Sequence, residues 1–189
     1  NDGVDAVTLL GVTGSGKTEI YIKAAHRTLS EGKNVLYLVP EIALSRQLED
    51  RLYEHFEERL MVFHSGETAA SKRDIAEIIR MQKGTSGNYI LLGTRSSLFL
   101  PHHDLGLIIV DEEHDASYKQ DSPAPRYNGR DTALMLYQLQ NSEQHSEQHS
   151  EQHPEQNSEQ AACNILLGSA TPSLEEMYNC LTGRHIKVE

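Results

Sequence analysis

Eight residues near the start of the chain have the types and the spacing of a loop that binds phosphate. The segment Gly11-Val-Thr-Gly-Ser-Gly16-Lys17-Thr18 fits the pattern G-x-x-x-x-G-K-[ST]. In such a loop the backbone N–H groups and the N-terminus of the next helix point at an anion. Lys17 would reach the β- and γ-phosphates of a nucleotide, and the Thr18 hydroxyl would bind Mg²⁺. An ordinary glycine turn is the alternative, but the Lys-Thr pair in register favours a nucleoside triphosphate site whose binding residues are Gly14, Ser15, Gly16, Lys17 and Thr18.

A second set of reactive side chains follows the apolar run Leu107–Val110. Asp111 is placed to hold Mg²⁺ opposite Thr18, and Glu112 to orient or deprotonate the water that attacks the nucleotide. A pair of solvated acids at the end of a strand is the alternative. A glutamate directly after the aspartate favours hydrolysis over transfer of the phosphoryl group to another substrate. The predicted catalytic residues are therefore Lys17, Asp111 and Glu112, and the predicted metal ligands are Thr18 and Asp111.

The elements around these residues alternate between strand and helix patterns, which is typical of an α/β fold with a mostly parallel sheet. We expect strands at 7–10, 34–39, 61–63, 89–92, 107–110, 164–167 and 185–188. We expect helices from Lys17, along the stripe from Leu44 to Phe56, around Ile75–Ile79, and over 130–139 and 173–181. Polar segments follow the strands, and in such sheets the carboxyl ends of the strands carry the functional residues. One edge of the sheet is therefore the predicted site.

Several segments at this edge carry a resemblance to superfamily 2 helicases. Asp111-Glu112-Glu113-His114 resembles the D-E-x-H box, and Gly168-Ser169-Ala170-Thr171 resembles the S-A-T motif. Pro40-Glu41-Ile-Ala-Leu44 and Gly93-Thr94-Arg95-Ser96 resemble motifs Ia and Ib, which face the nucleic-acid strand. Together with Gly11–Tyr21, His64–Gly66, Gly93–Phe99 and Asp111–Gln120, these segments are similar to the PriA family of bacterial replication-restart helicases. The resemblance covers nearly the whole chain outside 142–160.

The resemblance implies a RecA-like P-loop NTPase domain over residues 1–189, with helices on both faces of the sheet. This domain would be the first, ATP-binding lobe of a 3′-to-5′ DNA helicase for primosome assembly, driven along a single strand by ATP hydrolysis. It implies ATP and Mg²⁺ as cofactors, and single-stranded and forked DNA, the second RecA-like lobe and replication-restart proteins as partners. Zinc is expected in the parent protein but not here, because Cys163 and Cys180 form no C-x-x-C pair. Alone, the segment is expected to bind Mg-nucleotide weakly, with little ATPase activity and no unwinding.

The same resemblance makes the segment after the D-E-x-H box an aromatic-rich loop that couples DNA contact to hydrolysis. Aromatic faces stack on bases, and Lys and Arg side chains meet phosphates, although an ordinary surface loop is the alternative. Arg95 is the first candidate for a phosphate contact. His114 and the hydroxyls of Ser169 and Thr171 are expected to link the nucleotide site to the strand groove, while a local helix cap also suits the hydroxyls. The predicted DNA-contact and coupling residues are Pro40, Glu41, Thr94, Arg95, Ser96, His114, Tyr118, Lys119, Gln120, Arg126, Tyr127, Ser169 and Thr171.

Composition limits the function further. The net charge of −11 argues against a uniformly basic nucleic-acid binder, though it leaves room for a local basic stripe. A Ser-Glu-Gln-His repeat begins at Ser142 and, having no apolar residue to bury, predicts a disordered loop over 142–160. Weak metal binding by its histidines 145, 149 and 153 is the alternative. No segment resembles a signal peptide or a membrane span of roughly 20 apolar residues, so we expect no membrane partner. We expect the protein to be located in the bacterial cytoplasm, where its cysteines would be reduced.

Two other functions remain open. One is another superfamily 2 DNA translocase ATPase, which moves on duplex DNA without separating the strands. The other is a catalytically silent module that uses the fold as a docking surface. The intact set of Lys17, Thr18, Asp111 and Glu112 argues against the silent module, because a silent relative could dispense with these residues.

Overall fold

A single sheet of seven strands organises the chain in the computed structural model, which describes residues 6–12, 14–85, 87–147 and 162–188. The strand order is β3-β4-β2-β5-β8-β1-β9, and every neighbouring pair is parallel. The predicted parallel α/β sheet is confirmed. The strands are β1 (Ala6–Leu10), β2 (Asn34–Leu38), β3 (Leu60–Phe63), β4 (Ile90–Gly93), β5 (Leu105–Val110), β8 (Asn164–Ser169) and β9 (His185–Val188).

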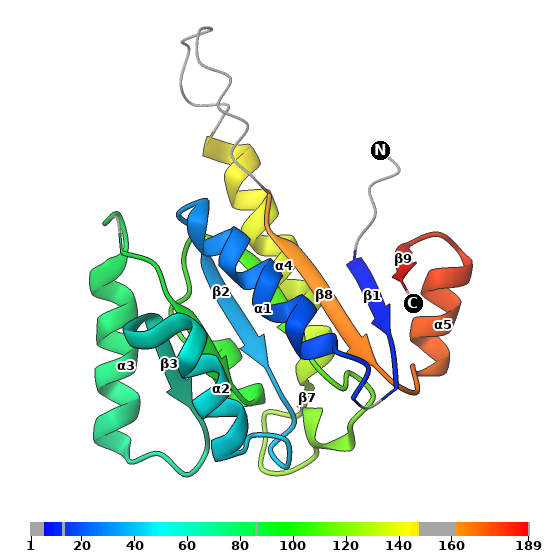
Figure 1. Ribbon diagram of the computed structural model, residues 1–189, viewed down its shortest axis with the longest axis horizontal. Helices are drawn as coiled ribbons and strands as arrows, with labels where there is room; N and C mark the ends of the chain where they lie inside the picture. The colour runs from blue at the N-terminus through cyan, green and yellow to red at the C-terminus, as the bar shows by residue number, and fades with distance from the viewer. Residues whose placement is uncertain (1–5, 13, 86, 148–161, 189) are drawn as a thin grey trace, which may run out of the picture.

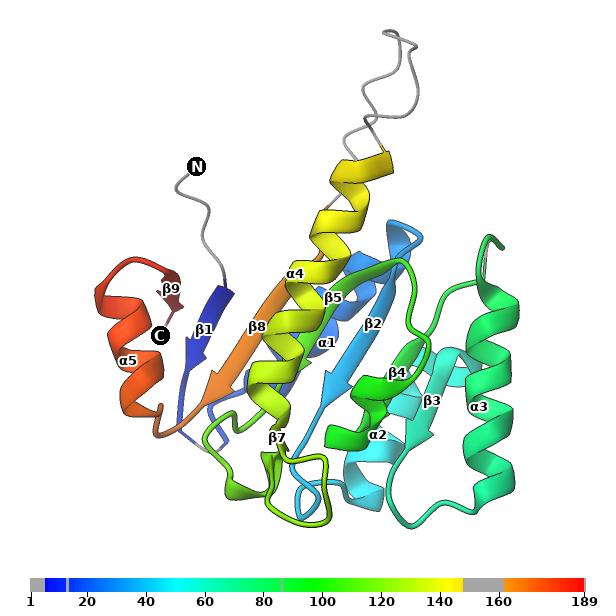
Figure 2. The same cartoon turned by 180° about the vertical axis from the view of Figure 1, so that it is seen from behind.

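Helices cover both faces of this sheet. Helices α1 (Lys17–Ser30) and α2 (Arg46–Phe56) pack on one face, where Tyr21, Ile22 and Phe56 join a core with residues of β2, β4 and β5. Helices α3 (Ala69–Gln82) and α4 (Gly129–Glu147) pack on the other face through Ile79 and Ala133. Figure 1 shows α1 in front of the sheet, and Figure 2 shows α4 in front when the molecule is turned around. Helix α5 (Leu174–Leu181) lies beside β1 and β9 at the edge.

The sequence explains these helices through their caps and apolar spacing. Ser45 caps α2 by accepting a hydrogen bond from the Leu48 N–H, and Thr68 caps α3 by accepting one from the Ser71 N–H. In α2 the side chains of Leu52 and Phe56 are fully buried while the opposite side is charged, as expected for a surface helix on a sheet.

The strand order brings distant loops together. Strand β8 lies between β5 and β1, so the chain that follows β8 emerges between the chains that follow β5 and β1. The Gly11 N–H donates to the Ser169 carbonyl at 3.1 Å, and the Glu113 N–H donates to the Gly168 carbonyl at 2.9 Å. These two bonds tie the ends of β1, β5 and β8 into one continuous rim.

The structure adds short elements that the sequence patterns did not predict. They are the 3₁₀ helices η1 (Glu57–Arg59), η2 (Arg95–Phe99) and η3 (Ala116–Tyr118), and a hairpin of β6 (Lys119–Gln120) and β7 (Tyr127–Asn128). In the described part of the chain, no helix is long and apolar enough to cross a membrane.

One boundary differs from the expectation. Helix α4 continues to Glu147, so the first residues of the predicted loop 142–160 are helical and that loop boundary is wrong. Glu and Gln are good helix formers, and extending an existing helix costs far less than starting one. Residues 148–161, with His149 and His153, lie outside the described residues, as does the side chain of His145.

Candidate functional site

The glycine loop between β1 and α1 has the backbone geometry that phosphate binding requires. Gly14 and Gly16 adopt φ values of +81° and +89°, a region that disfavours residues with a Cβ atom. Gly16 is the N-cap of α1, so the first N–H groups of the helix face out of the sheet edge. Thr13 lies outside the described residues. Within the loop the Ser15 N–H donates to the Val12 carbonyl at 3.0 Å. The helix that follows presents its first N–H groups, which have no partner inside the helix, at this edge of the sheet.

Lys17 lies inside this loop with its charge next to an acid. Only 8% of Lys17 is exposed, and its Nζ donates to the Gly11 carbonyl at 2.6 Å. The same Nζ lies 3.3 Å from Glu112 Oε1. The cation that is predicted to meet phosphates thus lies directly beside the predicted catalytic acid, although the two residues are far apart in the sequence.

Glu112 has a strained backbone. Its φ of +47° is in the left-handed region, where a residue with a long side chain pays a conformational cost of roughly 1–3 kcal/mol. The strained backbone accompanies the contact of the Glu112 carboxylate with Lys17, and its N–H donates to Asp111 Oδ1 at 3.0 Å. Strain of this kind persists only where the surrounding structure enforces it, and it is frequent at active sites.

Three buried tyrosines surround Asp111. The Tyr21 hydroxyl donates to Asp111 Oδ1 at 3.1 Å, and the Tyr118 hydroxyl donates to the Asp111 carbonyl at 2.7 Å. The Tyr37 hydroxyl is buried and has no partner in hydrogen-bonding geometry among the described residues. Burial raises its pKa well above the ordinary value, and the nearby Asp111 charge adds to this effect. The same hydroxyl lies close to the side chains of Thr18 and Asp111, the two predicted metal ligands.

The environment of Asp111 disfavours the charged form of its carboxyl group relative to the neutral form. Burial raises its pKa, and the neighbouring Glu112 charge raises it further. The Tyr21 hydrogen bond and the Lys17 charge act in the opposite direction. A buried carboxylate whose charge is poorly compensated is a good ligand for a cation, because binding removes the penalty.

His114 connects the acids to the end of β8. Its Nδ1 lies 2.8 Å from Ser169 Oγ and 3.8 Å from Glu112 Oε2. Ser169 is fully buried, and its Oγ also accepts from the Thr171 N–H at 3.2 Å. The two predicted linking segments therefore meet through a direct side-chain contact, while the exposed Thr171 side chain lies at the rim.

Arg95 lies at the predicted edge, and its partly exposed side chain is held by contacts with protein. Its Nη1 donates to the Ser117 carbonyl and lies 3.3 Å from the Lys119 carbonyl. Its guanidinium also lies 4.0 Å from Glu41. We therefore find Arg95 holding the loop after β5 in place, rather than free for a phosphate as the sequence suggested. Its neighbours Thr94 and Ser96 lie within hydrogen-bonding reach of each other at 3.5 Å, and Pro40 is buried while Glu41 is exposed.

The aromatic-rich loop divides into a buried and an exposed part. Tyr118 is only 2% exposed, so it has no face free to stack on a base, contrary to the role expected for it. Gln120 donates to the carbonyls of Pro123 and Pro125, which fixes the loop on itself. Lys119 and Arg126 are exposed. Tyr127 is half-buried and packs edge-on against Phe99, with ring centroids 5.0 Å apart.

Sequence reasoning missed four residues of this edge: Tyr21, Tyr37, Phe99 and Arg130. Phe99 is 61% exposed although it is a large apolar side chain, and in the sequence it stands out only as the last residue of the motif Gly93–Phe99. Tyr21 was visible as the fifth residue of α1, on the same helix face as Lys17, at a spacing of four residues. Nothing local identified its partner.

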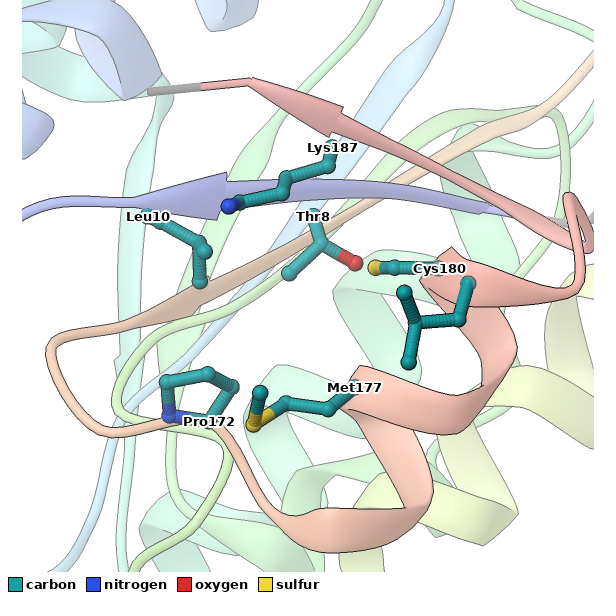
Figure 3. A pocket seen from close by; sticks show the side chains of 7 residues that line it. Thr8, Leu10, Pro172, Met177, Cys180 and Lys187 are labelled. Carbon is teal, nitrogen blue, oxygen red and sulfur yellow. The ribbon is translucent and has the colours of Figure 1, made fainter.

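The described residues contain no group of three or more His, Cys, Asp or Glu side chains that could hold a metal ion. This does not conflict with the predicted Mg²⁺ ligands Thr18 and Asp111, because Mg²⁺ commonly binds one or two protein ligands with waters and substrate phosphates. A cavity of about 140 Å³ lies elsewhere, between β1, α5 and β9, and Figure 3 shows Thr8, Met177 and Cys180 on its walls. It is smaller than ligand pockets of about 300 Å³ or more.

Comparison with known proteins agrees with this arrangement. The chain matches the DEAD/DEAH box helicase family over residues 3–180. It is 40% identical to the replication restart protein PriA of Rickettsia prowazekii over 98% of this chain and 24% of that protein. It is 44% identical to PriA of Helicobacter pylori over 89% of this chain and 23% of that protein. The chain thus spans about a quarter of the length of these curated relatives.

Among solved structures, the chain resembles RecG bound to a three-way DNA junction. The TM-score is 0.57 with 19% sequence identity, and the match covers 97% of this chain and 21% of that chain. At this identity the likeness concerns the fold alone, and it confirms the RecA-like α/β fold that the resemblance implies. The phosphate loop, the paired acids and the His114–Ser169 contact lie on that fold, and the chain belongs to the DEAD/DEAH box helicase family.

Proposed function

We propose that this chain is the first, ATP-binding lobe of an ATP-dependent DNA helicase of the replication-restart type. The observation that carries the proposal is the contact chain at the rim, in which Lys17 meets Glu112 and Glu112 neighbours the His114–Ser169 pair. It joins a phosphate-binding loop to a hydrolytic acid and to a segment that leads away from the nucleotide. PriA relatives at 40% and 44% identity support the replication-restart assignment.

The residues present fit a nucleotide with Mg²⁺. A Cβ built at Gly14 or Gly16 would meet nothing within 4 Å, so the space in front of the loop is open. Amides of Gly14 and Gly16 with Lys17 would hold the phosphates, and the Ser15 N–H would leave the Val12 carbonyl to join them. Thr18 with Asp111 would hold the metal. The buried Tyr37 hydroxyl lies close to the side chains of Thr18 and Asp111 and adds a polar group at the proposed metal site. When bound, Mg²⁺ would neutralise the charge that develops on the phosphate oxygens.

The protein groups have distinct roles in this proposal. Lys17 leaves the Gly11 carbonyl and Glu112 to meet the phosphates, which frees the Glu112 carboxylate to accept a proton from water. Tyr21 keeps the Asp111 carboxylate oriented, since its hydroxyl donates to Oδ1. His114 and Ser169 respond to the position of Glu112, because His114 Nδ1 is within 3.8 Å of its carboxylate.

We further propose that DNA lies along the edge formed by Glu41, Thr94, Ser96 and the loop after β5. The exposed Phe99 and the half-buried Tyr127 form an aromatic pair on which bases would stack, with Lys119 and Arg126 as cations for the DNA backbone. Arg95 and Tyr118 would couple this surface to Asp111 by holding the loop, and not by touching DNA. A second RecA-like lobe and replication-restart proteins complete the proposed assembly, in the bacterial cytoplasm. Zinc, if present, belongs to another part of the protein.

The experiment that tests this function uses the full-length protein and forked DNA. Lys17→Ala should abolish DNA-stimulated ATP hydrolysis while it leaves the affinity for DNA unchanged. Wild type should displace a strand; ATP hydrolysis on duplex DNA without displacement would instead identify another superfamily 2 translocase. Unchanged turnover in Lys17→Ala would refute the nucleotide site. We expect the 189-residue chain alone to show little ATPase activity, and fast DNA-stimulated turnover by it would refute that expectation.

A further inference from the structure

A buried ion pair lies directly behind the proposed catalytic acids. Glu113 stands between Glu112 and His114, and its side chain is completely buried. Its Oε2 lies 3.4 Å from Nη1 of Arg130, whose side chain is 9% exposed. Its Oε1 accepts from the Ser173 N–H at 3.0 Å. A buried charge is retained only with partners of this kind, because an uncompensated one is strongly destabilising.

All three nitrogens of the Arg130 guanidinium donate hydrogen bonds. Nη1 donates to Ser173 Oγ at 2.9 Å, and Nη2 donates to Glu175 Oε2 at 2.5 Å and to Asp131 Oδ1 at 2.8 Å. Nε donates to the same Asp131 oxygen at 3.0 Å. Lysine offers a single point charge and cannot make this set of bonds in one plane. The arrangement therefore depends on arginine specifically.

These contacts join three segments to which the proposed function gives different roles in ATP hydrolysis and DNA contact. Glu113 belongs to the segment of the hydrolytic acid. Ser173 is the N-cap of α5 and follows Thr171 by two residues. Arg130 lies in the first turn of α4, and the Asn128 side chain at the end of the β6–β7 hairpin caps its N–H at 2.9 Å. The hairpin carries Lys119 and Tyr127, the proposed DNA-contact residues.

We propose that Arg130 is a positioning residue that transmits the state of the loop after β5 to the nucleotide site. A shift of the hairpin moves the start of α4, and Arg130 pulls Glu113 and Ser173 with it because their bonds are buried and directional. Glu112 and His114 flank Glu113 in the chain, so their side chains move relative to Lys17 and Ser169. Arg130 thus sets how strongly bound DNA accelerates ATP hydrolysis. This inference rests on the proposed function.

The test compares Arg130→Lys with wild type in the full-length protein, with Arg80→Lys as the matched control. Arg80 lies on α3, is largely exposed and pairs only with Glu77 at 3.5 Å among the contacts of the described chain. ATP turnover is measured with and without single-stranded DNA, together with the affinity for DNA and the KM for ATP. Arg130→Lys should lower the DNA-stimulated-to-basal ratio about fivefold or more, the scale of typical allosteric coupling, with DNA affinity and KM near wild type.

A second variant covers the case in which Arg130→Lys does not fold. Arg130→Met combined with Glu113→Gln removes both buried charges, keeps the acceptor for the Ser173 N–H, and should fold with the stimulation ratio still reduced. A ratio within twofold of wild type in either folded variant would overturn the inference while the proposed function stands. An equal fall of basal and stimulated rates would also overturn it, since that indicates a structural role only. A wild type that does not respond to DNA would overturn both.

Discussion

Gly168 lies against the tyrosine that orients Asp111, and this makes Gly168→Ala a sharp test of the site geometry. A Cβ built at Gly168 would lie 1.7 Å from the Tyr21 hydroxyl oxygen, 3.0 Å from Tyr21 Cζ and 3.0 Å from Asp111 Oδ1. The Tyr21 hydroxyl must therefore move away by roughly 1 Å or more before the overlap with the new methyl group is relieved. Because Tyr21 is fully buried, that movement breaks its 3.1 Å hydrogen bond to the Asp111 carboxylate.

The expected cost has two parts. Overpacking a core site costs about 1–3 kcal/mol, and loss of a hydrogen bond to a charged group costs about 1.5–3 kcal/mol. We therefore expect Gly168→Ala to lower the free energy of unfolding by about 3 kcal/mol. For a domain of this size that corresponds to a fall in Tm of roughly 6–12 °C.

A double-mutant cycle with Tyr21→Phe isolates the contact, with thermal and urea unfolding of the 189-residue chain as the assay. Phenylalanine lacks the oxygen that clashes but keeps the ring carbon at 3.0 Å, so the double variant should recover about 1–2 kcal/mol relative to additive losses. Strictly additive losses, or a Gly168→Ala variant within about 0.5 kcal/mol of wild type, would show that Tyr21 does not pack here as described.

Three further predictions concern Asp111, the buried Tyr118, and the aromatic pair of Phe99 and Tyr127. Asp111→Asn should abolish hydrolysis yet raise the unfolding free energy at pH 7. The folded-state pKa of Asp111 is raised, so the wild type loses stability as the pH rises from the unfolded-state pKa through the folded-state pKa. The stability that Asp111→Asn gains over wild type should therefore shrink in thermal melts as the pH is lowered toward about 4. A gain of the same size at that pH would contradict this reasoning. Tyr118→Phe removes the 2.7 Å bond to the Asp111 carbonyl and should lower Tm by about 2–4 °C, for about 1 kcal/mol; an unchanged Tm would count against that bond. Phe99→Ala should leave Tm nearly unchanged but weaken single-stranded DNA binding by about 1–3 kcal/mol in fluorescence anisotropy, and equal affinity would exclude stacking on this pair.

The fold was largely readable from the sequence because its strands are apolar runs. All six residues of β5 are buried, as expected for a strand with neighbours on both sides and helices on both faces, and its core Leu107–Val110 was predicted. The predicted strand 185–188 has the same bounds in the structure. The β6–β7 hairpin was missed because it has two residues a strand and no hydrophobic alternation. The end of α4 was missed because composition describes a free segment, not one that continues a folded helix.

The site was predictable only where its functional residues lie within short contiguous motifs. The structure places Lys17 beside Glu112 and His114 beside Ser169, the residues that the motifs singled out. Tyr21 and Arg130 were missed because Asp111, the partner of Tyr21, is 90 residues away and Glu113, the buried partner of Arg130, is 17 residues away. Tyr37 was missed because only the strand order brings it close to Asp111. The direction in which a side chain points could not be predicted from the sequence either. Arg95 lies at the predicted edge, but its guanidinium contacts two backbone carbonyls, which its position in the sequence does not indicate.

The most direct test of the central claim is nucleotide binding by the chain itself. A fluorescent ATP analogue is titrated with Mg²⁺ into wild type and Lys17→Ala, with circular dichroism to show that both are folded. We predict saturable binding at a single site, weakened about tenfold or more in Lys17→Ala, because hydrogen bonds from a charged donor contribute about 1.5–3 kcal/mol. Equal affinity of the two proteins, or no binding by wild type at millimolar nucleotide, would contradict the account.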